Sequence, residues 1–125
     1  MWRARLSSSK ERTIIMNAVV KVIDKELALE RAGGNAQLAE ELFAMLLQEL
    51  PQHRNNIQAA VAGSDYTVLQ QHVHKLNGSA TYCGVPALKA AADSLEINLK
   101  RGRVEQVPGG VSEILDEIAR VLDAA

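Results

Sequence analysis

Apolar residues recur along most of this chain at spacings of three and four positions, the pattern of helices that bury one face. The pattern occupies four long stretches, at about 38–61, 66–82, 86–102 and 114–122. A weak alternating pattern at 13–23 is the one strand-like competitor. Long amphipathic helices with short connections favour an all-α fold, an antiparallel four-helix bundle.

Polar residues and glycines mark where helices begin and end. Asp24, Asn35 and Asp65 each precede a helical stretch, where their side chains can cap the first turn. The cap at Asp24 is followed by KELALERA, a short extra helix that Gly33 and Gly34 would end. The bundle is therefore expected to carry a short additional helix at its N-terminal side.

Prolines predict further boundaries. We expect Pro51 to kink the first long helix or to divide it in two, because proline removes a helical hydrogen bond. Pro86 suits the first turn of a helix that runs to Gly102, and Gly84 can close the helix before it. The segment VPGG at 107–110 is expected to break the chain again before the last helix.

Length and composition indicate one helical domain. A chain of 125 residues holds one sizeable core. Its hydrophobic share is 47%, but aromatic residues make up only 3%, so aliphatic side chains must fill the interior, which favours helices packed on helices. We interpret residues 1–22 as a linker or a cloning remnant and residues 23–125 as the bundle.

Charge and cysteine content narrow the function classes. The net charge is −1 with acidic and basic residues interspersed, so nucleic acid and anionic membrane surfaces are not expected as direct partners. The single Cys83 cannot form an internal disulfide, which fits a reducing, cytoplasmic setting. No apolar run is long and unbroken enough for a membrane span.

Two histidines fall on different faces of the helix predicted over 66–82. At about 100° per residue, His72 lies on the shoulder of the buried stripe that contains Leu69, whereas His74 lies about 140° from Leu69. Gly78, one turn after His74, leaves open space beside it, although a glycine inside a helix costs about 1 kcal/mol relative to alanine. An exposed, neutral imidazole in such a place can act as a nucleophile.

The sequence HKLNGSA at 74–80 resembles the phosphoacceptor motif of histidine-containing phosphotransfer (HPt) domains, H-x-[hydrophobic]-K-G-[small]. The resemblance covers about residues 24–123 and includes DKELALERAGGN before the motif and LLQELPQ in the first long helix. The longer phrase HKLNGSATYCGVPALK looks closest to the C-terminal HPt domain of BarA/GacS-type hybrid sensor histidine kinases.

The resemblance implies a role for particular residues. In this family, an exposed histidine of a four-helix bundle accepts a phosphoryl group from an aspartate of a receiver domain and passes it to the receiver of a response regulator. His74 matches that histidine, Gly78 the glycine that admits the receiver, and Gly84 a later small position. The supporting or receiver-docking positions are then Gln71, Lys75, Asn77, Gly78 and Thr81.

One position departs from the family pattern. The family usually has a lysine three residues after the histidine, and this chain has Asn77, which donates hydrogen bonds but brings no charge. Lys75 is near in sequence but lies about 100° around the helix from His74. Either residue could support the phosphoryl group.

The resemblance also implies a phosphocarrier rather than an enzyme. No glycine-rich phosphate loop or kinase-type ATP signature occurs in the sequence, so the domain is not expected to phosphorylate itself from ATP. It would need no cofactor of its own, and the Mg²⁺ would belong to the partner receiver. We expect a monomer in the cytoplasm, or at the cytoplasmic end of a membrane-anchored sensor kinase.

The same residues allow other interpretations. A helical adaptor that binds a protein partner without phosphotransfer is the alternative function. A metal site at His72 and His74 is disfavoured, because these side chains diverge by about 200° on a helix and helical zinc pairs use i, i+4 spacing. His53 is interpreted as a polar-face residue and Cys83 as a small packed residue rather than a reactive thiol.

Overall fold

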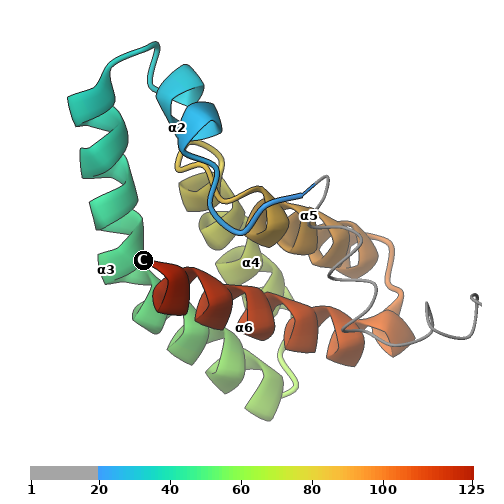
Figure 1. The fold of residues 1–125 in the computed structure, drawn as a ribbon. Coiled ribbons are helices and arrows are strands. Elements are labelled where there is room, and N and C mark those ends of the chain that lie inside the picture. Colours follow the sequence, from blue (N-terminus) through green and yellow to red (C-terminus); the bar gives the residue numbers. More distant parts are fainter. Residues whose placement is uncertain (1–19) are drawn as a thin grey trace, which may run out of the picture.

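The computed structural model describes residues 20–125, which form helices and no strands. The elements are α2 (Lys25–Arg31), α3 (Ala36–Ala62), α4 (Tyr66–Ala80), α5 (Pro86–Lys100), the 3-10 helix η2 (Val104–Gln106) and α6 (Val107–Ala124) (Figure 1). The predicted all-α fold is confirmed. Most of the linker predicted for 1–22 lies outside the described residues and stays a prediction.

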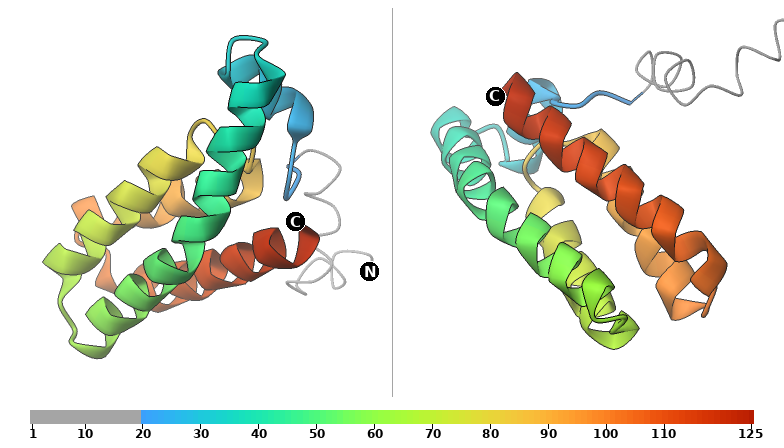
Figure 2. Two further views of the ribbon diagram at one scale, coloured as in Figure 1. Left: turned by 90° about the vertical axis from the view of Figure 1, so that its left-hand side faces the viewer. Right: turned by 90° about the horizontal axis from the view of Figure 1, so that it is seen from below.

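Helices α3 to α6 form the predicted antiparallel bundle. α5 packs against both α4 and α6, and α3 packs against α4 and α6, so the four helices enclose one core. Consecutive helices of the bundle run in opposite directions (Figures 1 and 2). The short α2 packs against α3, whose N-terminal half extends beyond the other helices (Figure 2).

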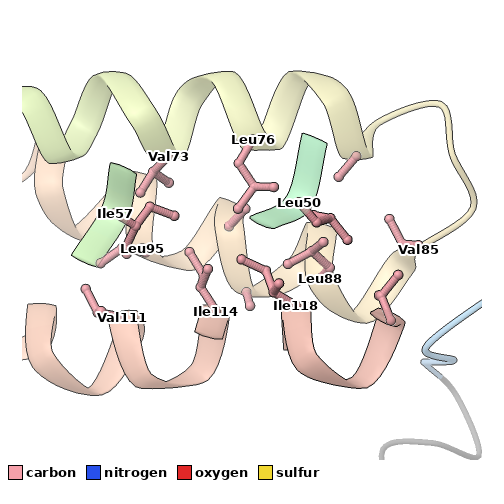
Figure 3. Packing of buried hydrophobic residues seen from close by; sticks show 14 of the residues in the cluster. Leu50, Ile57, Val73, Leu76, Val85, Leu88, Leu95, Val111, Ile114 and Ile118 are labelled. Atoms are coloured by element: carbon pink, nitrogen blue, oxygen red, sulfur yellow. The ribbon is translucent and has the colours of Figure 1, made fainter. Parts of the chain in front are cut away.

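Aliphatic side chains fill the core, as the composition predicts. Each helix of the bundle turns its apolar stripe inward (Figure 3). The largest fully buried side chains are Leu46, Leu50, Ile57, Leu69, Leu76, Leu88, Leu95, Ile114, Ile118, Val73, Val85 and Val121. This core fixes the rotation of α4 and α5 about their axes, and therefore decides which of their residues face solvent.

The predicted helix caps are confirmed. The side-chain oxygens of Asp24, Asn35 and Asp65 each accept a hydrogen bond from the backbone N–H three residues later, at 3.0, 3.0 and 3.1 Å respectively. Each bond satisfies a backbone donor that the first turn of the helix leaves free.

Pro51 does not divide the first long helix. α3 is continuous from Ala36 to Ala62 and contains Pro51. The helix changes direction along its length (Figure 1), as expected where proline removes one hydrogen bond of the ladder. The alternative of two separate helices was therefore wrong.

The VPGG segment does not form a break between helices. It forms the first turn of α6, which begins at Val107. Proline fits there because the N–H groups of a first turn have no helical partner. A Cβ atom on Gly110 would lie 2.8 Å from Cδ1 of Leu95, so this glycine lets α6 approach α5 closely. The interruption between α5 and the next helical segment lies earlier, at Gly102 and Arg103.

The helix that carries the histidines ends earlier than predicted. α4 stops at Ala80 rather than Tyr82, and a turn leads to Gly84, which has a φ of 70°. The carbonyl oxygen of Gly84 accepts a hydrogen bond from the backbone N–H of Asp24 at 2.8 Å. The end of α4 is thereby tied to the start of α2.

Candidate functional site

His74 lies on the exposed face of α4 and contacts an acidic residue of α5. Its side chain is 74% exposed, in agreement with the helical wheel, whereas that of Glu96 is only 9% exposed. The Nδ1 atom of His74 lies 2.7 Å from Oε2 of Glu96. The imidazole is held at one nitrogen by a nearly buried carboxylate, while most of its surface faces solvent.

The charge of Glu96 decides which nitrogen of His74 carries the proton. Burial by itself raises the pKa of Glu96, but hydrogen bonds from Asn77, His74 and Lys100 and the charge of Lys100 outweigh it and lower the pKa to about 2. An ionised carboxylate only accepts hydrogen bonds, so Nδ1 of His74 is the donor. In a neutral ring the lone pair then lies on Nε2, which Glu96 leaves free.

Side chains of α4 and α5 form a polar network around Glu96. Asn77 donates from Nδ2 to Oδ1 of Asp93 at 2.7 Å and to Oε1 of Glu96 at 3.0 Å. Lys89 donates to Oδ1 of Asn77 at 2.8 Å and to Oδ1 of Asp93 at 2.9 Å. The ammonium of Lys100 lies 3.2 Å from Oε2 of Glu96. We refer to these five residues as the α4–α5 network.

The surface beside His74 is open at Gly78. Gly78 is exposed, and a Cβ atom built on it would meet no atom within 4 Å beyond its own helix backbone and its chain neighbours. No packing inside the described part of the molecule therefore requires a glycine here. The missing side chain leaves room for another molecule to approach the imidazole.

A comparison with known domain families identifies the kind of domain that carries this surface. The sequence profile of the Hpt domain family matches residues 41–124. The chain belongs to the Hpt domain family. The resemblance seen in the HKLNGSA motif is therefore confirmed at the level of the family.

Curated relatives of this Hpt domain are sensor kinases. It is 43% identical to the sensor histidine kinase GacS of Pseudomonas protegens over 82 residues, which cover 66% of this chain and 9% of the kinase. It is 34% identical to the signal transduction histidine-protein kinase BarA of Shigella flexneri over 119 residues, 94% of this chain and 13% of the kinase. The Hpt domain spans about a tenth of the length of these kinases.

A solved structure supports the fold. The crystal structure of the HPT domain from a sensor hybrid histidine kinase of Shewanella matches with a TM-score of 0.78 and 35% identity, covering 82% of this chain and 89% of that chain.

Within residues 20–125, no helix has both the length and the apolar character needed to cross a membrane.

The supporting residues predicted for this Hpt domain do not all lie at one place. Asn77 belongs to the α4–α5 network, and Thr81 donates from Oγ1 to the carbonyl oxygen of Asn77 at 2.8 Å. Gln71 and Lys75 are exposed, and in the described part of the chain neither side chain forms a hydrogen bond or ion pair. The charge of Lys75 acts instead on His53 of α3, where it lowers the pKa of the imidazole.

The other residues considered as candidate sites have structural surroundings. His72 is half-buried with a buried Nδ1 atom, so it does not share the exposed face of His74. Residues 20–125 hold no cluster of three or more His, Cys, Asp or Glu side chains suited to a metal ion. Cys83 is buried, and burial, helped by the charge of Glu49, raises the pKa of its thiol to about 11, in agreement with a packed residue.

Sequence reasoning missed Glu96 and the residues of α5 around it. Lys89, Asp93, Glu96 and Lys100 follow one another at spacings of four, three and four, which places them along one face of a helix. Glu96 also directly follows Leu95 on the apolar stripe of α5. An acidic residue on a buried stripe was the signal that could have identified it.

Proposed function

We propose that Nε2 of His74 accepts a phosphoryl group from an aspartyl phosphate of a receiver domain and passes it to an aspartate of a second receiver. The hydrogen bond between His74 and Glu96 carries this proposal, because it keeps the proton on Nδ1 and the lone pair on the exposed nitrogen. The known role of Hpt domains in phosphorelays supports the same reading. Nothing in residues 20–125 favours an adaptor without phosphotransfer.

The step balances without a further reactant. The lone pair of Nε2 forms the bond to phosphorus as the bond between phosphorus and the aspartate oxygen breaks, and the aspartate leaves as a carboxylate. The imidazole keeps its proton on Nδ1 and gains positive charge. The ionised Glu96 stabilises that charge through the 2.7 Å hydrogen bond, since its low pKa prevents it from taking the proton.

The return step uses the same contacts in reverse. An aspartate of the second receiver attacks the phosphorus, and the electron pair of the P–N bond returns to Nε2. The Mg²⁺ that assists such transfers would be held by the receiver. The task of this domain is to present His74 at a fixed tautomer beside the open surface at Gly78.

The setting of the domain is part of the proposal. Its small share of the kinases that it matches supports a place within a larger hybrid sensor kinase, where it acts on the cytoplasmic side. The domain is proposed to act as a phosphocarrier without a kinase site of its own, in line with its family, and as a monomer.

Transfer from a labelled receiver tests the proposal. A receiver domain that carries a ³²P-labelled aspartyl phosphate is mixed with the wild-type chain and with the variants His74→Gln and His72→Gln. We expect label on the wild type and on His72→Gln, as an acid-labile and alkali-stable phosphohistidine. His74→Gln should keep its helical circular dichroism, because the side chain that it changes is exposed. It should take up no label, because it lacks the accepting imidazole.

The two histidine variants control for each other. Both lie on α4, and both replace an imidazole with an amide, so a general effect on the helix would alter them alike. Label on His74→Gln, or loss of label from His72→Gln alone, would contradict the assignment of His74 as the acceptor.

A further inference from the structure

The side-chain amide of Asn77 has only one orientation that satisfies its surroundings. It faces the ammonium of Lys89 on one side and the carboxylates of Asp93 and Glu96 on the other. An ammonium only donates hydrogen bonds and a carboxylate only accepts them, so the oxygen must point to Lys89 and the nitrogen to the two carboxylates. Lys89 therefore fixes the direction in which Asn77 donates.

Asn77 in turn assigns the two oxygens of Glu96 to different partners. Its nitrogen donates to Oε1 at 3.0 Å, and Oε2 is left to His74 at 2.7 Å and to Lys100 at 3.2 Å. Because the side chain of Glu96 is only 9% exposed, water supplies few alternative donors. The direction of the carboxylate thus depends on Asn77, and the proton position of His74 depends on the carboxylate.

We propose that Asn77 and Lys89 are positioning residues for the phosphoacceptor, acting through Glu96 to keep the proton of His74 on Nδ1. This inference rests on the proposed function for its purpose, and on the hydrogen bonds of the α4–α5 network for its mechanism. It gives the departure at position 77 a physical role, because an amide can both accept from a lysine and donate to a carboxylate.

Two substitutions each remove one part of this arrangement and leave the size of the side chain nearly unchanged. Aspartate at position 77 has the same shape but would turn a negative oxygen toward Asp93 and Glu96. A change of Lys89 to methionine keeps much of the side-chain length but removes the donor that holds the amide oxygen. Asn77→Asp and Lys89→Met therefore disturb the same relay from its two ends.

Side-chain ¹⁵N NMR of the isolated chain measures the relay directly. The two ring nitrogens have different chemical shifts according to which one carries the proton, and the ratio of tautomers is read at a pH at which imidazoles are neutral. We expect the Nδ1–H form to dominate in the wild type. The ratio should fall by about tenfold in Asn77→Asp, the size expected for loss of one hydrogen bond to a charged group, and less in Lys89→Met.

A matched lysine variant separates charge from positioning. Lys75→Met removes a positive charge one residue from His74 without touching the α4–α5 network, so its tautomer ratio should stay at the wild-type value. An unchanged ratio in Lys89→Met and in Asn77→Asp would overturn the inference, as would an equal change in Lys75→Met. Should Asn77→Asp fail to fold, Lys89→Met decides, because its changed side chain is at the surface and about one third exposed.

This measurement needs no receiver, so it fails or succeeds independently of the proposed function. If the wild-type domain accepts no phosphoryl group but the variants still change the tautomer ratio, the positioning role stands and only the proposed phosphotransfer is overturned. Where transfer occurs, Lys89→Met should slow phosphoryl acceptance at saturating receiver and leave the receiver concentration for half-maximal rate unchanged. A change in that concentration alone would assign Lys89 to docking and overturn the inference.

Discussion

His53 of α3 and His72 of α4 interact electrostatically between the two helices, and each has a buried ring nitrogen with no hydrogen-bond partner in the described part of the chain. Burial is the main cause that lowers the pKa of His53, and it is opposed by the negative charge of Glu49. The charges of His72 and Lys75 lower the pKa further. The interface between α3 and α4 therefore favours the neutral form of His53.

Acid should weaken the fold through His53. Its pKa is lower in the folded chain than the ordinary value of 6.5, so the unfolded chain binds the proton more tightly. The stability is then complete above pH 6.5 and is lost as the pH falls through 6.5 toward the folded pKa. Urea unfolding at about pH 7.5 and about pH 5.5 should give a lower free energy of unfolding at the lower pH.

The variant His53→Gln isolates this contribution. Glutamine has a polar side chain that does not titrate, so the free energy of unfolding should change less between the two pH values than in the wild type. Glu96 does not interfere, because its pKa is lowered to about 2 and its stabilising effect is lost only as the pH falls below about 4.5. An equal pH dependence in His53→Gln and the wild type would contradict the prediction.

Gly78 should be replaceable by alanine with a gain in stability. The added Cβ meets no atom within 4 Å, and alanine has a higher helix propensity than glycine by about 1 kcal/mol. Thermal or urea unfolding of Gly78→Ala should show a gain of up to about that size. Gly78→Gln should also fold but should slow phosphoryl acceptance severalfold, because its side chain occupies the open surface beside His74. Native transfer by Gly78→Gln would contradict the access argument.

Gly84 should respond in the opposite way. It has a φ of 70°, and a Cβ there would collide with the carbonyl oxygen of Asp24 and lie 2.7 Å from Cβ of Ala28. Gly84→Ala should lose about 1–3 kcal/mol of stability from the backbone conformation alone, and more from the displacement of α2. Gly33→Ala is the matched control, because its φ of 68° carries the same strain in open space. Equal losses in both variants would show that the contact with α2 adds nothing.

Features that depend on neighbouring residues were predictable from the sequence. The caps Asp24, Asn35 and Asp65 bond to backbone atoms three residues away, so a short stretch of sequence contains both partners. The exposure of His74 also follows from one helix, because the apolar stripe of α4 fixes its rotation.

Features that depend on two helices were not predictable in the same way. His74 and Glu96 are 22 residues apart, and their contact requires the relative placement of α4 and α5. The predicted break at VPGG is wrong because proline is tolerated in the first turn of a helix. The glycine at position 110 reflects a contact with Leu95 of α5, which the sequence of α6 alone does not contain. Continuity of α3 through Pro51 likewise reflects packing of both halves, which outweighs one lost hydrogen bond.

The orientation of Asn77 leads to a prediction about the lysine that the family usually has at this position. In Asn77→Lys, the new ammonium would lie beside the carboxylates of Asp93 and Glu96, which the present amide already contacts. It would pair with these carboxylates rather than with a phosphoryl group on the exposed Nε2 of His74. We therefore expect the lifetime of the phosphohistidine to change by less than about twofold, since exposed charge pairs contribute little.

The salt dependence of the phosphohistidine lifetime distinguishes a lysine that contacts the phosphoryl group from one that pairs with α5. A lysine that reached the phosphoryl group would stabilise it by a Coulomb interaction that weakens as ionic strength rises. The lifetime is measured on isolated phosphorylated chains of the wild type and Asn77→Lys, at low and at high salt, with Lys75→Met as the control for general charge. A longer lifetime in Asn77→Lys that fades at high salt would mean that position 77 faces the phosphoryl group. An unchanged lifetime at both salt concentrations would instead assign this position to the contact with α5, where Lys89 already supplies the positive charge.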